Sequence, residues 1–487
     1  MDVTYREASA FEKKKRGGIS LQFAERKLLL MVMDLLVLNG ALFLMLSLWP
    51  QPVFARLAER FPWYALLLSL IWLVVSAFFN VYDLAKAASA VHSIWAAGTS
   101  VLITLTIYIL IPYLTPVLPD RRTQFAVFFL TALIGVTLWR FIYATVFTHP
   151  SFRHRALVIG AGWSGETLLR AIQETASETG NPYLGTGYEL LGFVDDDPEK
   201  QETDIEGVPV LGAGKDLLRL VDELQPDEII IAITHSQRIH PELFRAILAC
   251  YELGVPITTM AALYERMTGR VPVQHAGQDL TVLMPVSRPS GFRFYLALRR
   301  VGDIFFSILG LAIVALLTPL VWLGNLITDP GAVFYRQSRV GEHGKVFEII
   351  KFRSMVMDAE ADTGAVWAQE NDPRVTPVGK FLRRTRLDEL PQFWNVLKGD
   401  MSLIGPRPER PEIIEKLSDD IPFYGLRHAV KPGITGWAQV RYRYGASKED
   451  AFIKLQYDLY YIKHLGPFID FSVLIKTIQV VLGMKGR

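Results

Sequence analysis

The segment RRTRLDELPQF, residues 383–393, places Asp388 and Glu389 among Arg383, Arg384 and Arg386. A carboxylate in a cationic pocket stays ionised, so it can attack phosphorus as a nucleophile or hold Mg²⁺. A second interpretation is structural, because Thr385 and Asp388 fit the S/T-x-x-D/E capping pattern at the start of a helix. The local pattern alone favours the cap, but capping leaves Glu389 and the arginines unexplained.

Two further segments of the C-terminal region carry cations suited to phosphate. Residues 334–355, FYRQSRVGEHGKVFEIIKFRSM, predict a strand, a turn and a second strand that carries Lys351. These cations could bind phosphate, or they could face anionic lipid at a membrane surface. In GPRP, residues 405–408, two prolines present Arg407 rigidly, which suits a phosphate clamp or a simple stiff loop. The segment 431–445 predicts a stiff turn and then a strand carrying Arg441 and Arg443.

A third motif, GAGWSG at residues 160–165, follows a predicted strand and precedes a predicted helix. Gly160, Gly162 and Gly165 have the G-x-G-x-x-G spacing with which a backbone turn admits a pyrophosphate at a helix start. The acidic residue expected about 20 positions later is not evident, and the acidic cluster 195–197 lies beyond an insertion. The motif therefore predicts either a nucleotide turn or tight turning alone, and the missing acid favours the second.

The elements that position these residues begin with four apolar blocks, at 28–49, 63–82, 94–114 and 125–147. Each has about the 20 residues that a helix needs to cross a hydrocarbon core. Asp34, near one end, and Arg140, able to snorkel or pair, are the charges inside them. The run KKKR, in the leader 1–27, favours a cytoplasmic N-terminus. We expect four transmembrane helices within residues 28–150.

Composition agrees with a membrane protein. Hydrophobic residues make up 51% of the 487, and the net charge of +2 gives no sign of a nucleic-acid partner. The mean hydropathy is +0.25. The single cysteine, Cys250, lies in an apolar helical pattern, which predicts a buried structural thiol rather than a nucleophile.

Residues 151–285 alternate predicted strands and helices, which indicates a Rossmann-like, doubly wound domain. A fifth apolar block, 303–327, follows, with arginines and lysines on both sides. Basic flanks on both sides favour a return to the cytoplasmic face. Pro319 should bend the helix, and Thr318 could satisfy a freed backbone group. We therefore expect a re-entrant helix, although a fifth span that places 328–487 outside stays open.

Taken together, YRQSRVGEHGKVFEIIKFRSM, LRRTRLDELPQFWNVLKGDMSLIGPRPE and KPGITGWAQV resemble the bacterial sugar transferase family. Its members are polyprenyl-phosphate hexose-1-phosphate transferases, also called monotopic phosphoglycosyl transferases. The resemblance covers residues 290–487. With its four apolar blocks and α/β segment, the chain is similar to the larger members, of the undecaprenyl-phosphate glucose or galactose phosphotransferase type, which initiate exopolysaccharide, capsule or O-antigen synthesis.

The resemblance implies a membrane α plus α/β fold, with a transferase domain at 286–487 on the cytoplasmic side of a bacterial inner membrane. It implies that Asp388 attacks the sugar-linked phosphate of a UDP-sugar, releases UMP and passes the phosphosugar to undecaprenyl phosphate. Asp388 and Glu389 would hold Mg²⁺. Phosphate binding would fall to Arg383, Arg407 and Lys351, and the helix break to Thr318 and Pro319.

A different class of function stays open, namely a nucleotide-sensing membrane protein that acts through the Rossmann-like domain. It predicts tight dinucleotide binding by residues 151–285 and no turnover. A homodimer through the membrane or middle region is a further expectation.

Overall fold

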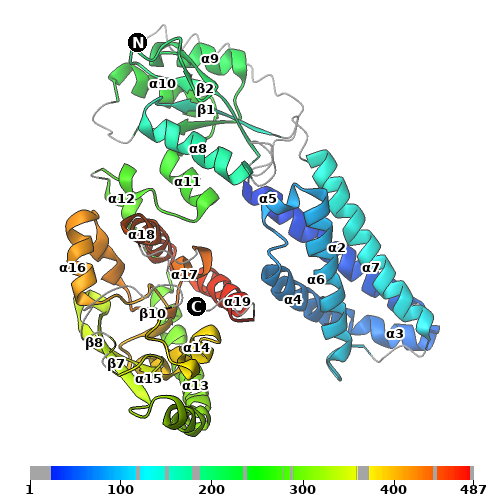
Figure 1. Ribbon diagram of the computed structural model, residues 1–487. Coiled ribbons are helices and arrows are strands. Elements are labelled where there is room, and N and C mark those ends of the chain that lie inside the picture. The colour runs from blue at the N-terminus through cyan, green and yellow to red at the C-terminus, as the bar shows by residue number, and fades with distance from the viewer. Residues whose placement is uncertain are drawn as a thin grey trace. The chain divides into compact units, whose positions relative to one another are not determined.

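The computed structural model describes residues 23–116, 121–147, 153–177, 187–233, 239–277, 279–285, 288, 290–357, 359, 372–442 and 447–482. The KKKR run of the leader therefore lies outside the described residues. The chain divides into two compact units, Met1–Thr268 and Gly269–Arg487. Figure 1 labels their helices and strands.

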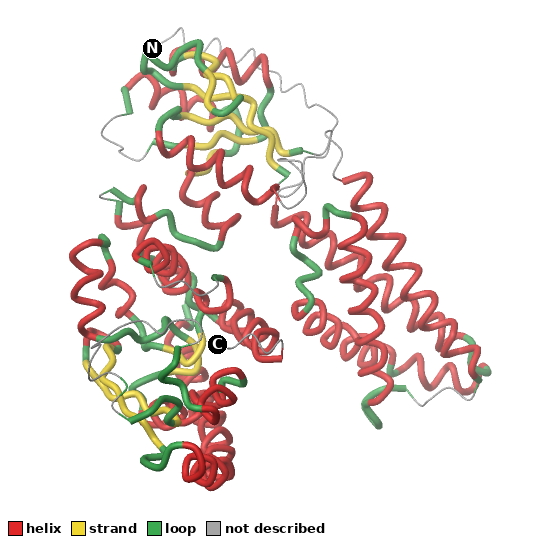
Figure 2. Tube along the Cα trace, in the orientation of Figure 1, coloured by secondary structure: helices red, strands yellow, loops and turns green. Residues whose placement is uncertain are grey.

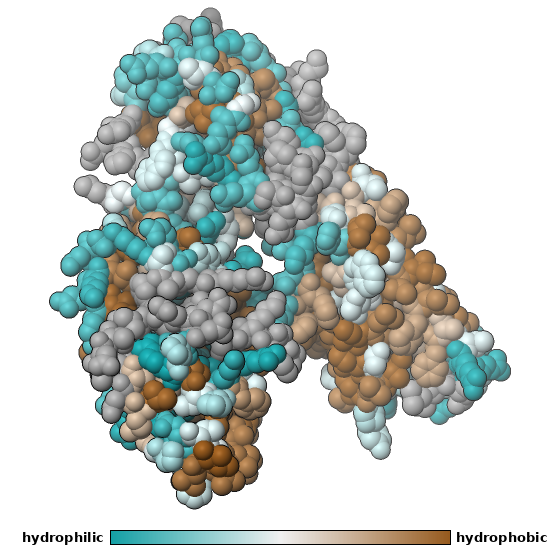
Figure 3. All heavy atoms as spheres, in the orientation of Figure 1, coloured by the Kyte–Doolittle hydropathy of each residue, from teal (hydrophilic) through white to brown (hydrophobic). Residues whose placement is uncertain are grey.

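Four long helices occupy the four predicted apolar blocks: α2 (Phe23–Ser47), α4 (Phe61–Phe78), α6 (Ala90–Leu110) and α7 (Arg122–Ile142). Shorter helices, α3 (Gln51–Glu59), α5 (Leu84–Ala87) and η1 (Tyr143–Phe147), connect or extend them. Their shared core includes Leu42, Trp72, Val101 and Phe128. The outward surface of these helices is also apolar (Figure 3). In the part of the chain that is described, these four helices and one later helix are long and apolar enough to cross a membrane.

The two charges inside the apolar blocks pair with each other. Arg140 on α7 forms an ion pair with Asp34 on α2, and both side chains are fully buried. Arg140 also donates to the carbonyl of Val81 at 3.1 Å. The expectation that Asp34 lies near an end was therefore wrong, because it sits inside α2 against its counter-ion. Pairing offsets part of the cost of two charges in an apolar bundle.

The Rossmann-like domain is confirmed as a doubly wound sheet in the order β3-β4-β2-β1-β5-β6. Its parallel strands are β1 (His154–Ile159), β2 (Tyr188–Val194), β4 (Val208–Gly212), β5 (Glu228–Ile231) and β6 (Ile257–Thr259). The edge strand β3 (Asp204–Ile205) is antiparallel. Helices α8 (Trp163–Ser177), η3 (Gly214–Asp216), α9 (Leu217–Leu224), α10 (Pro241–Glu252) and α11 (Met260–Thr268) accompany the sheet, with helices on both faces (Figure 2). Cys250 is buried, as predicted, and burial raises the pKa of its thiol to about 11.

The segment after Thr268 packs in the second unit. It includes η5 (Val273–His275) and α12 (Leu280–Leu283). Val273 and Leu283 lie in one apolar core with Leu455 and Leu459. The domain boundary expected at 285/286 thus falls inside a segment that belongs to the core of the second unit.

After α12, the second unit continues with one long helix, α13 (Phe292–Thr328), of 37 residues. It begins 11 residues before the predicted block at 303 and continues through Pro319. The hydroxyl of Thr318 donates to the carbonyl of Val314 at 2.7 Å. Buried positions recur at helical spacing on both sides of the proline, and most other apolar side chains of α13 are exposed. One face of α13 therefore packs on the protein and the rest presents an apolar surface.

The remainder of the unit is α/β. The hairpin β7 (Phe334–Val340) and β8 (Val346–Phe352) is antiparallel with η6 (Glu342–Gly344) at its turn, as the sequence predicted. A second, parallel pair joins β9 (Ser402–Ile404) to β10 (Gly433–Thr435). The helices are α14 (Pro377–Arg384), η7 (Leu387–Gln392), α15 (Phe393–Lys398), α16 (Pro411–Asp420), η8 (Tyr424–Ala429), α17 (Trp437–Arg441), α18 (Lys448–Lys463) and α19 (Pro467–Leu482).

One secondary-structure expectation was wrong in this region. The segment expected as a strand carrying Arg441 is the short helix α17, which follows β10 directly. Arg443 lies outside the described residues.

Candidate active site

The acid pair lies in the first turn of η7, directly after a chain reversal. Arg386, between α14 and η7, has a left-handed backbone with φ of 57°. This conformation is uncommon for a residue with a side chain and ends α14 sharply. Asp388 and Glu389 are therefore presented by a short helix that starts in a new direction, rather than by a continuation of α14.

The predicted cap at Thr385 was wrong. Thr385 follows the last residue of α14, and its hydroxyl donates back to the carbonyls of Phe381 at 2.8 Å and Leu382 at 3.2 Å. The helix that does start with a threonine cap is α14, where Thr376 accepts from the amide of Gly379 at 2.9 Å. Since Thr385 does not cap η7, capping no longer competes as an explanation for Asp388.

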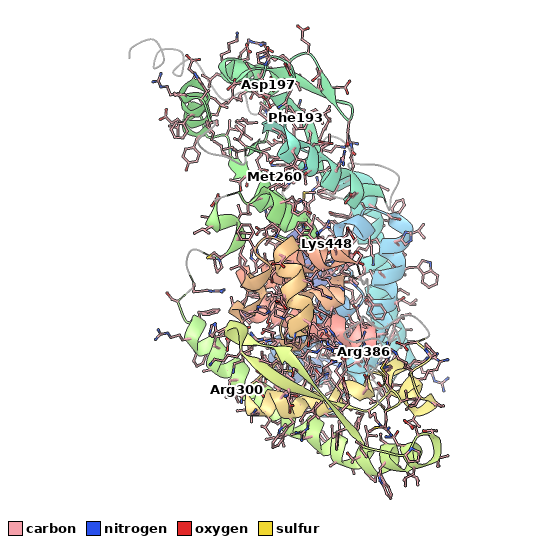
Figure 4. All side chains as sticks on the ribbon, turned by 60° about the vertical axis from the view of Figure 1, so that its left-hand side comes forward. Phe193, Asp197, Met260, Arg300, Arg386 and Lys448 are labelled. Carbon is pink, nitrogen blue, oxygen red and sulfur yellow. The ribbon has the colours of Figure 1, made fainter. Side chains whose placement is uncertain are left out.

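Glu389 lies at the centre of three cations. Arg407 donates to Glu389 Oε1 at 2.7 Å, and Lys351 Nζ lies 3.6 Å from the same oxygen. Arg386 Nη1 lies 3.9 Å from Oε2 (Arg386 is labelled in Figure 4). Burial by itself would raise the pKa of Glu389, but Arg407 and Lys351 outweigh it and hold that pKa well below its usual range. Glu389 is therefore an ionised anchor for the surrounding cations.

Asp388 differs from its neighbour in having no bonding partner among the described residues. It is 9% exposed, and among the described residues no hydrogen bond or ion pair reaches its carboxylate. Solvent reaches both carboxylate oxygens, because neither is among the fully buried polar atoms that lack a partner. Burial and the charge of Glu389 raise its pKa, whereas Lys351, Arg383 and Arg407 oppose the rise. Adjacent carboxylates driven to opposite pKa values are typical of acids with different roles.

The cations come from separate elements, and not every predicted basic residue faces the acids. Lys351 comes from β8, and burial lowers its pKa to about 8. Arg383, on α14, donates to Ser354 Oγ at 2.9 Å. Arg353, two residues after Lys351, instead binds Asp329 at 2.9 Å, after the end of α13. Lys351 thus serves the site, while Arg353 ties the hairpin to α13.

A buried hydrogen-bond network that no sequence motif indicated supports the backbone of Arg407. Arg427 donates to the carbonyl of Arg407 at 2.9 Å, to Asp458 at 2.8 Å and to the hydroxyl of Tyr424 at 2.7 Å. Arg427 is 6% exposed and Asp458 1%. No local motif marks these residues, because they come together only when η8 and α18 pack.

The loop of Arg407 also packs backbone against backbone. A side chain on Gly405 would place its Cβ 2.3 Å from the carbonyl of Lys431, and one on Gly436 would place it 2.1 Å from the carbonyl of Gly405. The amide of Gly433 donates to the carbonyl of Pro406 at 2.9 Å. The GPRP and KPGITG motifs therefore fit together as one rigid support for Arg407.

The acid-bearing segment is fastened to α13. Arg300 donates to the carbonyls of Val396 and Leu397 at 2.6 and 2.7 Å, at the end of α15 (Arg300 is labelled in Figure 4). A Cβ on Gly310 would lie 2.3 Å from the ring of Phe393, so the two helices are in close contact there. Arg300 was interpreted from sequence only as a topological flank, but it also connects the site to the apolar helix.

The glycine turn of the first unit has a different geometry. Gly160 has φ of 106°, and a Cβ on Gly165 would lie 2.4 Å from the carbonyl of Gly160, so both glycines are required by the turn. The expected acid is present after all. Asp195 directly follows β2, and it accepts from the amide of Ala161 at 2.7 Å. The insertion before β2 displaced it in sequence, not in space.

Gly162 is the open position of this turn. A Cβ there would meet only Lys200 Nζ, at 3.9 Å. Lys200 in turn lies 3.5 Å from Asp195. The amide of Ala161, directly after Gly160, is thus already bonded within the protein. This favours the interpretation that the glycines serve tight turning alone.

The oxygens of Asp388 fit a magnesium ion of the kind that shares its ligands with a substrate, whereas Glu389 Oε1 already accepts from Arg407. Within the described ranges, no group of three or more His, Cys, Asp or Glu could hold a metal by itself. Mg²⁺ commonly takes one or two carboxylates and completes its shell with phosphate oxygens and water. The unbonded, solvent-reached oxygens of Asp388 suit such a ligand.

The region that contains the acid pair matches a known family. Residues 294–484 match the family described as bacterial sugar transferase, and residues 77–261 match a CoA-binding domain. The chain is 36% identical over 310 residues to "UDP-N-acetylgalactosamine-undecaprenyl-phosphate N-acetylgalactosaminephosphotransferase" of Aeromonas hydrophila, covering 62% of this chain and 69% of that protein.

Two further relatives match over shorter stretches. A "Putative undecaprenyl-phosphate N-acetylgalactosaminyl 1-phosphate transferase" of Bacillus subtilis is 54% identical over 133 residues, 27% of this chain and 74% of that protein. The "UDP-glucose:undecaprenyl-phosphate glucose-1-phosphate transferase" of Escherichia coli is 43% identical over 183 residues, 37% of this chain and 39% of that protein.

The acid pair, its cations and the apolar helix thus belong to a membrane-associated transferase. The chain is a member of the bacterial sugar transferase family.

Proposed function

We propose that this enzyme transfers a sugar 1-phosphate, a hexose 1-phosphate in the first instance, from a UDP-sugar to undecaprenyl phosphate and releases UMP. The observation that carries the proposal is the state of Asp388: a largely buried carboxylate in a cationic site, still reached by solvent and bound to nothing among the described residues. The names of the relatives support the two substrates. The enzyme would catalyse the first membrane step of exopolysaccharide, capsule or O-antigen synthesis.

In the first step, an oxygen of Asp388 attacks the sugar-linked phosphorus of the UDP-sugar. A new oxygen–phosphorus bond forms, the bond from that phosphorus to the oxygen bridging to UMP breaks, and UMP leaves with the electron pair. In the second step, a phosphate oxygen of undecaprenyl phosphate attacks the same phosphorus, and the bond to Asp388 breaks. Two successive displacements at the same phosphorus, through a covalent intermediate on Asp388, give ping-pong kinetics.

The residues around Asp388 neutralise the charge of the phosphates and orient them. Phosphoryl transfer depends on positioning and on charge stabilisation more than on proton transfer. Arg383, Arg407 and Lys351 supply positive charge from three elements, and Glu389 fixes Arg407 and Lys351. Mg²⁺ held by Asp388, Glu389 and the phosphates would add charge neutralisation.

The apolar helix explains how one site meets a soluble and a lipid substrate. Arg300 and the contact of Gly310 with Phe393 hold the acid-bearing segment on α13, whose other faces are apolar (Figure 3). We propose that α13 enters the cytoplasmic face of the bacterial inner membrane, bends near Thr318 and Pro319, and returns. Asp388 would then lie near headgroup height.

Two measurements test the reaction. The first is a screen of UMP release across UDP-sugars with the purified full-length protein and undecaprenyl phosphate. The second is mass spectrometry of the protein after incubation with the reactive UDP-sugar alone. We expect UMP release with one or a few donors and a phosphosugar mass on the peptide that contains Asp388. Release without any adduct, together with sequential kinetics, would rule out the covalent step.

The path of α13 is tested by cysteine labelling. Lys345, at the hairpin turn after α13, is replaced by cysteine in a Cys250→Ala background and exposed in intact cells to a membrane-impermeant thiol reagent. We expect protection in intact cells and labelling after permeabilisation. Labelling from outside would place residues 328–487 across the membrane and reject the re-entrant path. Sedimentation of the purified full-length protein tests the expected homodimer.

A further inference from the structure

The strand that carries Lys351 has one edge bound by a side chain instead of a strand. Among the described residues, β8 pairs only with β7. At its other edge, the amide of Ile350 donates to Asn395 Oδ1 at 3.1 Å, and Asn395 Nδ2 donates to the carbonyl of Glu348 at 2.7 Å. A residue of a parallel neighbouring strand would bond to β8 in the same way. The carboxamide of Asn395, 2% exposed, therefore substitutes for a third strand.

Asn395 belongs to the helical stretch that bears the acid pair. It lies in α15, which continues directly from η7. The same stretch contacts β8 at Glu389, 3.6 Å from Lys351 Nζ, and at Val396, which packs with Ile349. Three contacts thus fix β8 against the stretch formed by η7 and α15. Of these three, the contact of Asn395 is the one made to the backbone of β8.

We infer that Asn395 is a positioning residue that sets the register of β8 against the acid-bearing helix and thereby holds Lys351 at Glu389. Side chains alternate along a strand, so a slip of one residue would turn Lys351 to the opposite face. Apolar contacts such as that of Ile349 tolerate sliding better than a paired donor and acceptor do, because hydrogen bonds require a defined geometry. The inference deepens the proposed function and rests on it for the role of Lys351.

The decisive variant is Asn395→Leu, which keeps the size of the side chain and removes both bonds. Its matched control is Gln456→Leu, which removes another buried amide of the same unit, bonded to Gln274 at 2.8 Å. The readout is the yield of a carbodiimide cross-link between the Lys351 amine and the Glu389 carboxylate, measured by mass spectrometry of the full-length protein. This readout does not depend on enzyme activity.

In the wild type, Lys351 Nζ lies 3.6 Å from Glu389 Oε1, close enough for a zero-length cross-link. Release of the strand in Asn395→Leu should move the amine away from the carboxylate, so most of the cross-link should be lost. Gln456→Leu should leave the cross-link yield unchanged. An unchanged yield in Asn395→Leu would overturn the inference, because a purely structural side chain would alter the amount of folded protein and not the cross-link yield per folded molecule.

Activity gives a second, independent criterion. Small displacements of a positioned group commonly cost about 10²-fold in rate, so we expect kcat for UMP release to fall at least about tenfold in Asn395→Leu. The double variant Asn395→Leu/Lys351→Ala should be no slower than Lys351→Ala, since residues that act through one another are not additive. Additive losses would show that Asn395 acts by another route.

A substitute variant covers a folding failure. If Asn395→Leu does not yield folded protein, Asn395→Asp keeps the acceptor for Ile350 and loses the donor to Glu348, and it should also lower the yield of the Lys351–Glu389 cross-link. A wild-type yield in that variant would also overturn the inference. Should the wild type release no UMP from any donor, the proposed function fails, while the cross-linking result still decides whether Asn395 holds Lys351.

Discussion

Asp195 in the first unit and Asp388 in the second invite comparison, because both are acids placed beside a motif associated with phosphate. Asp195 accepts from Ala161 of the glycine turn at 2.7 Å and lies 3.5 Å from Lys200. Asp388 has cations around it and, among the described residues, no bonding partner. The first carboxylate has its bonding capacity filled by the fold, whereas the second keeps its capacity for a ligand. Unused capacity in a charged environment is what distinguishes a reactive acid from a structural one.

The strongest test of this contrast replaces each acid by its amide. We expect Asp388→Asn to lower UMP release by at least about 10³-fold, since a nucleophile has no substitute. Asp195→Asn, which still offers an oxygen to Ala161, should release UMP close to the wild-type rate. Initial rates with saturating UDP-sugar and undecaprenyl phosphate decide the matter, and wild-type-like turnover by Asp388→Asn would end its assignment as nucleophile.

The next test compares two arginines of the second unit. Arg407→Met should lower kcat by about 10²-fold, the usual cost of losing one transition-state donor. Arg353→Met removes the tie to Asp329 and should mainly lower the unfolding temperature. Rates per folded molecule, with the folded fraction taken from thermal unfolding, separate the effects. Equal losses of rate per folded molecule in the two variants would mean that Arg407 contributes no more to the reaction than Arg353 does.

The pH profile sharpens the contrast between Asp388 and its neighbour. Burial and the charge of Glu389 raise the pKa of Asp388, so activity should be lost on acidification at a higher pH than an ordinary aspartate would give. Glu389→Gln removes the negative charge, which lowers the pKa of Asp388 and should move the acid limb of kcat/KM to lower pH. A limb that stays in place would show that another group titrates.

The smallest expected effect concerns the glycine turn. Gly165→Ala forces a methyl group to within 2.4 Å of the carbonyl of Gly160, and such overpacking costs about 1–3 kcal/mol. Gly162→Ala, which meets only Lys200 at 3.9 Å, should be nearly neutral. Thermal unfolding of both variants provides the measurement. If Gly165→Ala were as stable as Gly162→Ala, the turn would not need its third glycine for packing.

Sequence patterns predicted what depends on composition and short spacing. The four apolar helices, the alternating α/β segment and the β7–β8 hairpin all follow from hydrophobic runs and turn residues. The capping pattern at Thr385 was misleading, because the same residue types can end one helix as easily as they start the next. Short spacing alone does not show which side of a chain reversal a residue belongs to.

What escaped prediction depends on packing between distant segments. Arg427 reaches Asp458 and the carbonyl of Arg407 only through the packing of η8 and α18. Asn395 looks like an ordinary helix residue until β8 lies beside it. Asp195 was noted in the cluster 195–197 but discounted, because an insertion lengthens the sequence between the glycine turn and β2 without moving the end of the strand. Such partners are set by topology, which residue spacing does not encode.

The close packing of Gly405 and Gly436 has a practical consequence for protein engineering. Any side chain at either position would collide with backbone atoms at 2.3 or 2.1 Å, and a backbone cannot rotate away as a side chain can. Libraries that seek altered donor preference should therefore keep these two glycines fixed. Diversity is better placed in segments near the acid pair that do not support Arg407, where a new side chain avoids these backbone contacts.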